Sequence, residues 1–416
     1  MFRAFCDCSE MVSISEFFLY ARRHAPFPPT GALKSSLQGA FCLEGRDNMK
    51  DEAYMELALR LAERGKGWTS PNPMVGAVIV KEGRIIGQGF HRRCGQAHAE
   101  REALAACTES PEGATLYVTL EPCCHQGRQP PCTQAILESG IRRVVVGARD
   151  PNPLVAGRGI AQLRERGVEV TEHVLEDACT RLNFIFFHYI QTKRPYTALK
   201  YAMTLDGKTA AYTGASKWIT GEAARRHVHG LRHQYRAILA GVGTVLADDP
   251  QLTCRLSEGR SPVRVVCDTH LRTPLTAQVV RTAREVPTLL ATCCREEKCW
   301  APYQAEGCEV LSLPGREGHV DQDALLEELG RREIDGLLIE GGGALAWSAL
   351  EQGVVQRVYA YVAPLMLGGA AARSPVEGRG FPDPAGAVRL GPCGVTRLGD
   401  DLLLESEVLP HVHGDR

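Results

Sequence analysis

Side chains that bind metals or move protons gather in the segment "HAERE…TLEPCCHQGRQPPC", residues 98–132. His98 and Glu100 form an H-x-E pair, and Pro122 and Cys123 begin a second motif. Zinc-dependent deaminases carry H-x-E followed by P-C-x-x-C, in which the His and two Cys bind zinc while the Glu transfers protons. The pattern therefore indicates a hydrolytic deaminase.

The second cysteine of this motif is displaced, because position 126 is Gln. The candidates are Cys124, which is adjacent to Cys123, and Cys132, which follows after eight intervening residues. Consecutive side chains usually diverge, whereas Cys132 begins the next predicted helix. We therefore expect His98, Cys123 and Cys132 to bind Zn²⁺, with a water in the fourth position whose proton Glu100 accepts.

Other readings of this segment stay open. His125 is able to complete a closed, structural zinc site, and the protein would then be a non-catalytic binding protein. Cys-Cys pairs are more often plain thiols, and a disulfide is disfavoured in a reducing compartment. A Glu100→Gln variant separates these readings, since deamination requires the carboxylate.

Composition limits the class of protein. The chain has 416 residues, which favours two domains. A net charge of −1 without a long basic block argues against a nucleic-acid partner, and thus against an RNA-editing or nucleoside deaminase with an accessory domain. No apolar run reaches the ~18 residues of a membrane span. The 16 scattered cysteines, without a clear signal peptide, favour free thiols in a cytoplasmic protein.

The pattern along the chain predicts three parts. Residues 1–48 are rich in Pro, Gly and Ser, so we expect a disordered or mis-started extension. Residues 49–194 alternate strands with helices, which predicts an α/β domain. Its last helix is expected as one piece over residues 175–193, ended by Pro195. Residues 195–416 show a second, unrelated α/β rhythm.

Two features of the second part suggest ligands weakly. "GLLIEGGGALAWSAL" reads as a strand, glycines and a helix, a phosphate-binding arrangement without the G-x-G-x-x-G fingerprint. The pair Asp248–Asp249 is either a surface turn or half of a two-carboxylate metal site. The segment 355–364 is predicted to be the last long strand.

The first part resembles the deaminase half of the bifunctional riboflavin-biosynthesis deaminase/reductase family. The resemblance rests on "SPNPMVGAVIV", "GFHRRCGQAHAE" and "TLEPCCHQGRQPPC". It implies a cytidine-deaminase-like, three-layer fold, and the long Cys-to-Cys spacing is that family's own; Gln129 departs from the usual Thr. It also implies that Asn72 and His125 contact the pyrimidine, and that His91 and the Gly127–Arg128 loop line the pocket.

The second part resembles the reductase half of the same family, a dihydrofolate-reductase-like α/β domain, through "LKYAMTLDGKTA", "SKWIT", "GVGTVLADDPQLTCR", "IEGGGALA" and "APLMLGG". The resemblance implies NADPH as cofactor. The residues that it assigns to NADPH are Ala202, Trp218, Thr244, Asp248, Thr269, Gly342, Gly343, Ala344, Leu345 and Ala346. Those that it assigns to the substrate are Lys200, Ser216, Arg232, Leu252, Arg255 and Glu340.

Within that set, Arg232 and Arg255 suit a ribose phosphate, because guanidinium groups pair with phosphate oxygens. Lys200 and Glu340 are expected to orient or protonate the sugar. The resemblance thus implies deamination of 2,5-diamino-6-ribosylamino-4(3H)-pyrimidinone 5′-phosphate, followed by NADPH-dependent reduction of the ribosyl side chain. We expect a homo-oligomer that acts on this small pyrimidine phosphate.

Overall fold

The computed structural model describes residues 51–125, 130–152 and 155–410. The expectation of a disordered or mis-started extension over residues 1–48 lies outside these residues. So does the Gly127–Arg128 loop.

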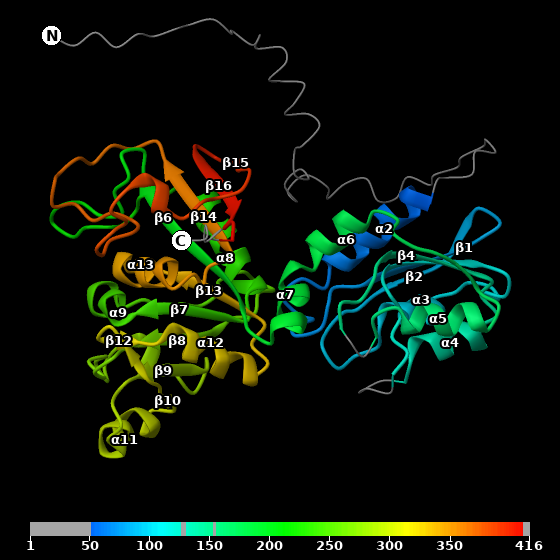
Figure 1. The fold of residues 1–416 in the computed structure, drawn as a ribbon, viewed down its shortest axis with the longest axis horizontal. Helices are drawn as coiled ribbons and strands as arrows, with labels where there is room; N and C mark the ends of the chain where they lie inside the picture. Colours follow the sequence, from blue (N-terminus) through cyan, green and yellow to red (C-terminus); the bar gives the residue numbers. More distant parts are fainter. Residues whose placement is uncertain (1–50, 126–129, 153–154, 411–416) are drawn as a thin grey trace, which may run out of the picture. The chain divides into compact units, whose positions relative to one another are not determined.

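The first sheet has five strands in the order β2-β1-β3-β4-β5 (Figure 1). β1 pairs antiparallel with β2 and β3, while β3, β4 and β5 are mutually parallel. The strands are β1 (Gly76–Lys81), β2 (Arg84–Phe90), β3 (Thr115–Leu120), β4 (Arg143–Ala148) and β5 (Glu169–Thr171).

Helices cover both faces of this sheet, because successive buried residues of a strand point to opposite sides. Ala77 and Ile79 of β1 pack in one cluster with residues of three helices, and Val78 and Val80 pack in a second cluster with residues of three others. The first group is α3 (Ala99–Ala105), α4 (Cys132–Glu138) and α5 (Arg158–Glu165), and the second is α2 (Asp51–Glu63), α6 (Glu176–Leu182) and α7 (Phe184–Thr192). The three-layer arrangement predicted for this part is confirmed.

The single helix predicted over residues 175–193 is wrong, since the structure has α6 and α7 with a break at Asn183. The Asn183 side chain accepts a hydrogen bond from the backbone N–H of Met74 (2.7 Å) and donates one to the Met74 carbonyl (2.8 Å). This pairing holds Asn183 at φ −106° and ψ 25°, outside helical geometry. A tertiary contact thus overrides the local helical pattern.

The second sheet has nine strands in the order β10-β9-β8-β7-β13-β6-β14-β16-β15. Its pairs are parallel from β10 to β14, and β16 and β15 add antiparallel. The strands are β6 (Tyr196–Thr204), β7 (Ala237–Gly241), β8 (Val263–Cys267), β9 (Thr288–Thr292), β10 (Glu309–Ser312), β13 (Gly336–Glu340), β14 (Arg357–Ala363), β15 (Gly394–Leu398) and β16 (Asp401–Glu407). The prediction that residues 355–364 are the last long strand is wrong, because β16 is as long as β14.

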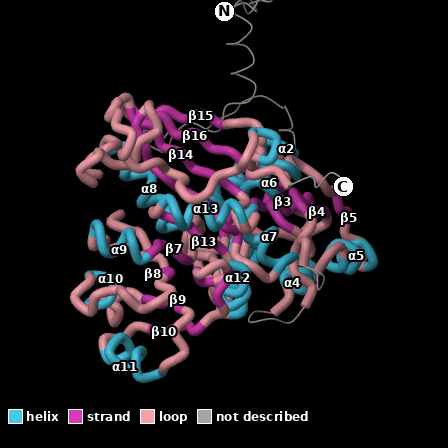
Figure 2. Tube along the Cα trace, turned by 60° about the vertical axis from the view of Figure 1, so that its left-hand side comes forward, coloured by secondary structure: helices cyan, strands magenta, loops and turns pink. Residues whose placement is uncertain are grey.

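Both faces of this sheet are also covered by helices, which Figure 2 shows flanking the strands. Leu337 and Ile339 pack in one cluster with residues of α12 and α13, and Leu338 packs on the other face with α8. The helices are α8 (Glu222–Gln234), α9 (Val242–Asp248), α10 (Gln278–Arg281), α11 (Glu297–Ala305), α12 (Gln322–Arg331) and α13 (Gly343–Glu351). A short hairpin of β11 (Gly315–Arg316) and β12 (His319–Val320) and the 3₁₀ turn η1 (Pro384–Gly386) complete the elements.

The parallel strands bring their carboxyl ends to one edge of the sheet, where ligands of open α/β sheets bind. Glu340 ends β13 and is paired in register with Lys200 of β6. Gly241 ends the neighbouring β7 and begins the turn into α9. In the described part of the chain, no helix is both long and apolar enough to cross a membrane.

Candidate active sites

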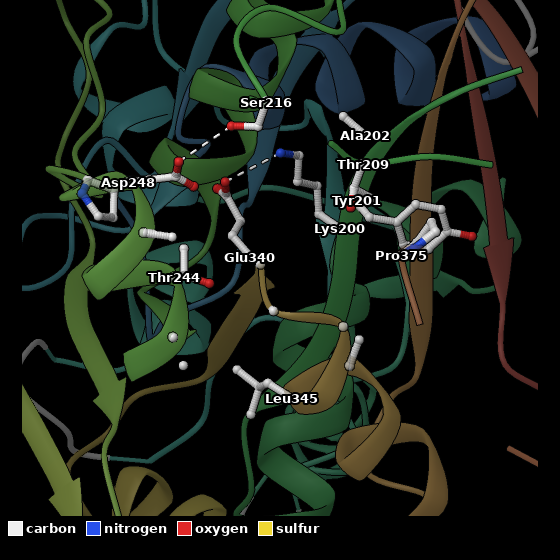
Figure 3. A pocket seen from close by; sticks show the side chains of 18 of the residues that line it. Lys200, Tyr201, Ala202, Thr209, Ser216, Thr244, Asp248, Glu340, Leu345 and Pro375 are labelled. Carbon is white, nitrogen blue, oxygen red and sulfur yellow. Dashed lines mark hydrogen bonds and ion pairs between the residues drawn. The ribbon is translucent and has the colours of Figure 1, made fainter. Parts of the chain in front are cut away.

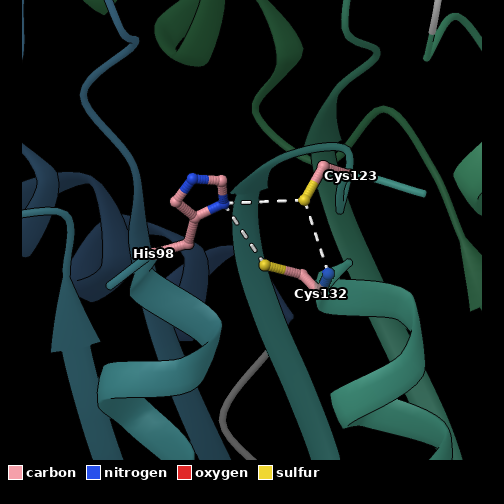
Figure 4. A group of neighbouring side chains, drawn as sticks. All are labelled: His98, Cys123 and Cys132. Atoms are coloured by element: carbon pink, nitrogen blue, oxygen red, sulfur yellow. Dashed lines mark hydrogen bonds between the residues drawn. The ribbon is translucent and has the colours of Figure 1, made fainter. Parts of the chain in front are cut away.

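Three potential metal ligands converge in the first domain (Figure 4). The His98 Nδ1 atom lies 3.6 Å from the Cys123 sulfur and 3.4 Å from the Cys132 sulfur. All three ligand atoms lie within 4.8 Å of one another. Zinc with Zn–N near 2.0 Å and Zn–S near 2.3 Å in tetrahedral geometry places such atoms about 3.5 Å apart, so the group fits a zinc ion.

The His98 side of this group comes from the start of α3. His98 is the N-cap of the helix, and Glu100 lies in its first turn. Two glycines of β2 let this helix approach the sheet: a Cβ on Gly87 would lie 2.4 Å from the Ala103 carbonyl oxygen, and one on Gly89 would lie 2.5 Å from the Ala103 nitrogen. Close packing of α3 on β2 therefore fixes where the imidazole and the carboxylate emerge.

The two thiols come from the end of β3 and the start of α4. The backbone N–H of Cys132 donates to the Cys123 sulfur (3.4 Å), and that of Thr133 donates to the Cys123 carbonyl (3.2 Å). The Cys132 thiol, followed by His98, lowers the pKa of Cys123 to about 4. Cys123 is therefore held as a thiolate, the form that binds zinc.

Glu100 is the buried carboxyl of this site, with 3% of its surface exposed. Its burial, followed by the negative charge of Cys123, raises its pKa to about 6. A carboxyl group whose pKa lies close to neutral pH is suited to accept and return protons.

The other candidates of the opening segment are not part of the ligand group. The group contains His98, Cys123 and Cys132 and does not include His125. Glu102 forms an ion pair with Arg92 at 3.1 Å instead. Within the described residues, a closed four-ligand zinc site is therefore not formed, and a position remains for water.

A cavity of about 380 Å³ opens beside the ligands, lined by Asn72, His91 and His125 among others. The Asn72 amide N–H₂ lies 3.2 Å from His91 Nε2, and His91 Nδ1 lies 3.0 Å from the Ala97 carbonyl. The carbonyl can only accept, so Nδ1 carries the ring proton and Nε2 accepts from Asn72. The Asn72 oxygen is left as an acceptor for a ligand, and the buried Nδ1 of His125 has no partner among the described residues.

The sequence reading missed three residues that shape this cavity. Glu121 accepts hydrogen bonds from the backbone N–H groups of Gly157 (2.9 Å) and Gly159 (3.0 Å), which fixes the start of α5 behind the site. Asp150 and Asn152 line the cavity from the loop after β4. The signal was available, since "RDPNP" places polar residues directly after a buried strand.

The second domain contains a larger cavity, of about 670 Å³, at the carboxyl edge of its sheet (Figure 3). Every residue that the resemblance assigns to NADPH or to the substrate of the reductase lines it. From the cofactor set these are Ala202, Trp218, Thr244, Asp248, Thr269 and the run Gly342, Gly343, Ala344, Leu345 and Ala346. From the substrate set they are Lys200, Ser216, Arg232, Leu252, Arg255 and Glu340.

A charge network lies at the base of this cavity. The Glu340 carboxylate accepts from Arg232 Nε (2.8 Å) and Nη2 (2.9 Å) and pairs with Lys200 Nζ at 3.5 Å. Burial raises the pKa of Glu340, but the charges of Arg232 and Lys200 outweigh it and lower the value to about 2. Glu340 is therefore held as a carboxylate between the Arg232 and Lys200 side chains.

The side chains of the two predicted phosphate ligands, Arg232 and Arg255, differ in how firmly they are held by other residues. Arg232 is held by Glu340 and by the Thr253 carbonyl (3.0 Å), whereas the side chain of Arg255 is exposed. His229, which the sequence reading missed, accepts from the Arg255 backbone N–H at 3.3 Å and lines the same cavity. Burial, followed by Arg232 and Arg255, lowers the pKa of His229 to about 4.

The glycine run after β13 brings backbone N–H groups to the cavity. Gly341 and Gly342 have φ values of +91° and +77°, and a Cβ on Gly341 would lie 3.0 Å from the Thr244 hydroxyl. Only glycine fits both the conformation and the space. The turn delivers the start of α13 at Gly343, and a helix N-terminus favours phosphate.

The carboxylates of Asp248 and Asp249 face different partners. Asp248 accepts from the Ser216 hydroxyl at 3.4 Å, and Asp249 accepts from the Gln278 backbone N–H at 2.7 Å. Neither belongs to a metal-binding group among the residues that the structure describes. The two-carboxylate metal site is therefore not formed there.

Comparison with known proteins agrees with both halves. Residues 48–148 match the family model of the cytidine and deoxycytidylate deaminase zinc-binding region, and residues 195–404 match that of the RibD C-terminal domain. The riboflavin biosynthesis protein RibD of Actinobacillus pleuropneumoniae is 52% identical over 87% of this chain and 96% of its own length. RibD of Escherichia coli is 42% identical over 77% of this chain and 89% of its own length.

Solved structures support the same assignment. The deaminase/reductase of Thermotoga maritima has a TM-score of 0.78 at 39% identity and covers 86% of this chain and 99% of its own. RibD of Acinetobacter baumannii has a TM-score of 0.77 at 38% identity, with coverage of 86% and 99%. Given these matches, the predicted fold class is confirmed, and the chain belongs to the RibD family of riboflavin biosynthesis proteins.

Proposed function

We propose that the two cavities catalyse two consecutive steps, with the residues that line them in specific roles. His98, Cys123 and Cys132 hold the zinc ion, and Glu100 is the proton carrier of the deaminase. Ala202, Trp218, Thr244, Asp248, Thr269 and Gly342–Ala346 hold NADPH. The observation that carries the proposal is the His98–Cys123–Cys132 triangle beside a buried carboxyl.

In the deaminase step, zinc when bound lowers the pKa of a coordinated water toward neutrality. Glu100 takes one proton from the attacking water and delivers it to the ring nitrogen. It then carries the proton of the added hydroxyl to the leaving amine, so that the carbon–nitrogen bond breaks, ammonia departs and the carbonyl forms. The Asn72 oxygen accepts from a pyrimidine N–H, and His125 contributes a hydrogen bond from its unpartnered ring nitrogen. The substrate would be 2,5-diamino-6-ribosylamino-4(3H)-pyrimidinone 5′-phosphate, which loses its 2-amino group as ammonia.

In the reductase step, NADPH when bound supplies the hydride. Arg255 and Ser216 hold the ribose phosphate, and Leu252 closes the apolar side of the cavity. Lys200 Nζ, which lies beside Glu340, gives its proton to the sugar oxygen as the ring opens. Arg232 mainly anchors Glu340 and offers its remaining N–H groups to the substrate. The product would be 5-amino-6-(5-phosphoribitylamino)uracil.

We further propose a domain boundary at residues 194/195, where α7 has ended and β6 begins. A homo-oligomer is supported by exposed apolar side chains at the second sheet's free edge, Val395 of β15 and Leu402 of β16. Light scattering of the purified chain tests this, and a monomer at micromolar concentration would contradict it. The free thiols of the described cysteines support a cytoplasmic location.

The function is tested by incubating the purified zinc-loaded protein with the diaminopyrimidine phosphate, with and without NADPH. We expect ammonia in both reactions and the ribityl product only with NADPH. No ammonia would refute the deaminase assignment, and ammonia without NADPH oxidation would refute the reductase assignment.

A further inference from the structure

A tight turn follows β6 at the border of the reductase cavity. The Thr204 backbone N–H donates to the Lys208 carbonyl (2.9 Å), and the Lys208 N–H donates to the Thr204 hydroxyl oxygen (2.9 Å). The Thr204 hydroxyl donates in turn to the Asp206 carboxylate. Asp206 is thus oriented by its own turn.

The same carboxylate reaches a second segment far along the chain. Asp206 Oδ1 accepts from the Leu367 backbone N–H at 3.1 Å, and Oδ2 accepts from the Gly368 N–H at 2.7 Å. The Leu205 N–H adds a hydrogen bond of 2.8 Å to the Leu365 carbonyl. These donors, with the Thr204 hydroxyl first among the causes, lower the pKa of Asp206 to about 2. A partly exposed carboxylate with three protein donors is more tightly engaged than a solvated surface charge.

The segment that Asp206 holds has little else to hold it. Leu365, Met366 and Leu367 are exposed, so they contribute little packing. Gly368 and Gly369 follow with φ values of +64° and +86°. A segment with few buried apolar contacts depends on its hydrogen bonds for order.

Both tethered segments continue into the wall of the cavity. Residues 209–218 leave the turn and contribute Thr209, Ser216 and Trp218, and residues 373–377 leave the tethered loop and contribute Arg373 to Pro375 and Glu377. The Thr209 N–H donates to the Arg373 carbonyl at 2.9 Å, so the two stretches are joined. Figure 3 shows Ala202, Thr209 and Pro375 on one side of the cavity, with Thr244 and Asp248 on the other.

We infer that Asp206 is a positioning residue of the reductase: its carboxylate ties the 365–369 loop to the turn after β6 and thereby fixes the cavity wall formed by residues 209–218 and 373–377. The inference rests on the proposed reductase function. Because the wall carries Trp218 of the proposed NADPH set and Ser216 of the proposed substrate set, but neither Lys200 nor Glu340, loss of the tie is expected to weaken ligand binding, which the KM for NADPH reports, more than the reaction of the bound complex.

The test compares Asp206→Ala, Asp206→Asn and Asp400→Ala in the full chain, with the deaminated intermediate as substrate. Asp400 is exposed in the turn between β15 and β16 and lines neither cavity, so it is the matched control. We expect the KM for NADPH to rise about tenfold in Asp206→Ala, as for a lost set of charge-assisted hydrogen bonds, with kcat changed by less than about threefold. Asp206→Asn keeps acceptance at one oxygen only, so an intermediate KM is expected.

The readouts separate the possible failures. In a separate assay with the diaminopyrimidine phosphate, ammonia release by the variants should equal that of the parent, which shows that the deaminase half is intact. A KM for NADPH in Asp206→Ala within twofold of the parent value would overturn the inference, as would a lowered melting temperature with unchanged KM. If Asp206→Ala does not fold, an Asp206→Asn variant with parental KM overturns it instead. Failure of the parent itself to oxidise NADPH would refute the reductase function.

Discussion

The two cavities hold their reactive groups by different means. In the deaminase, His98, Cys123 and Cys132 are set by the starts of two helices and by backbone hydrogen bonds. In the reductase, Lys200, Arg232 and Glu340 hold one another through charge. One site is thus prepared for a metal that supplies the reactive water, and the other for a cofactor that supplies the hydride.

This difference has consequences for substitution. A metal site depends on each of its ligands and on its proton carrier. A charge network distributes its effect over several groups, but removing one member leaves the others buried without a counter-charge. We therefore expect sharp, single-residue failures in the first site and combined losses of rate and stability in the second.

The largest expected effect is in Glu100→Gln. The amide cannot accept the water proton, so ammonia release should fall about 10³-fold or more. Zinc content by mass spectrometry and NADPH-dependent reduction of the deaminated intermediate should stay at parental levels. Deamination at more than a tenth of the parental rate would show that Glu100 is not the proton carrier.

Cys132→Ser should remove the zinc and with it the deaminase activity, because a hydroxyl is a poor zinc ligand next to a thiolate. The matched control is Cys124→Ser, which changes a neighbouring thiol outside the ligand group. We expect a zinc content near zero for the first variant and parental zinc for the second. The reverse result would exchange the roles of the two cysteines.

Glu340→Gln should combine two losses in the reductase. The free energy of unfolding is expected to fall by about 3 kcal/mol, because Arg232 and Lys200 lose a buried counter-charge. NADPH oxidation should fall about a hundredfold, since Lys200 is no longer positioned. The control Glu405→Gln breaks a more exposed pair with Arg357 and should cost less than about 1 kcal/mol. If chemical denaturation showed the same loss of stability for both variants, the network of Lys200, Arg232 and Glu340 would contribute no more to stability than the more exposed pair does.

The smallest expected effect concerns pH. His229 has a folded pKa of about 4, below its ordinary value of 6.5, so the unfolded chain binds its proton first as the pH falls. The stability that His229 contributes in its neutral form is full above pH 6.5 and is lost as the pH falls from there toward 4. His229→Gln should therefore lose less stability than the parent between pH 7 and pH 5. An identical pH dependence of unfolding would contradict a buried, neutral His229.

Much of the architecture could be read from the sequence, because its strands and helices carry strong local patterns. "MVGAVIV" and "GLLIE" are continuous apolar runs, and the structure has buried strands there as β1 and β13. The break at Asn183 and the hairpin of β15 and β16 were not predicted. The first depends on a pairing with Met74 that lies 109 residues away, and the second has a half-exposed strand with weak patterning.

The residues of the two sites could be predicted from the sequence to different extents. The zinc group is a motif of rigid spacing, so residue types alone pointed to His98, Glu100, Cys123 and Cys132. The reductase residues have no chemistry that demands them individually, and the family resemblance had to supply them. Supporting groups such as Glu121, His229 and Asp206 act through backbone contacts between distant segments, which no local pattern reveals.

The most direct test of two independent chemistries in one chain is to mix the Glu100→Gln and Glu340→Gln variants. With the diaminopyrimidine phosphate and NADPH, ammonia release and NADPH oxidation are followed in the same sample. Each variant alone should make ribityl product at no more than about a hundredth of the parental rate, whereas the mixture should release ammonia at the Glu340→Gln rate and then oxidise NADPH. Ribityl product from either variant alone at a rate close to the parental one, or ammonia release that disappears in Glu340→Gln, would contradict the assignment of the two steps to these two sites.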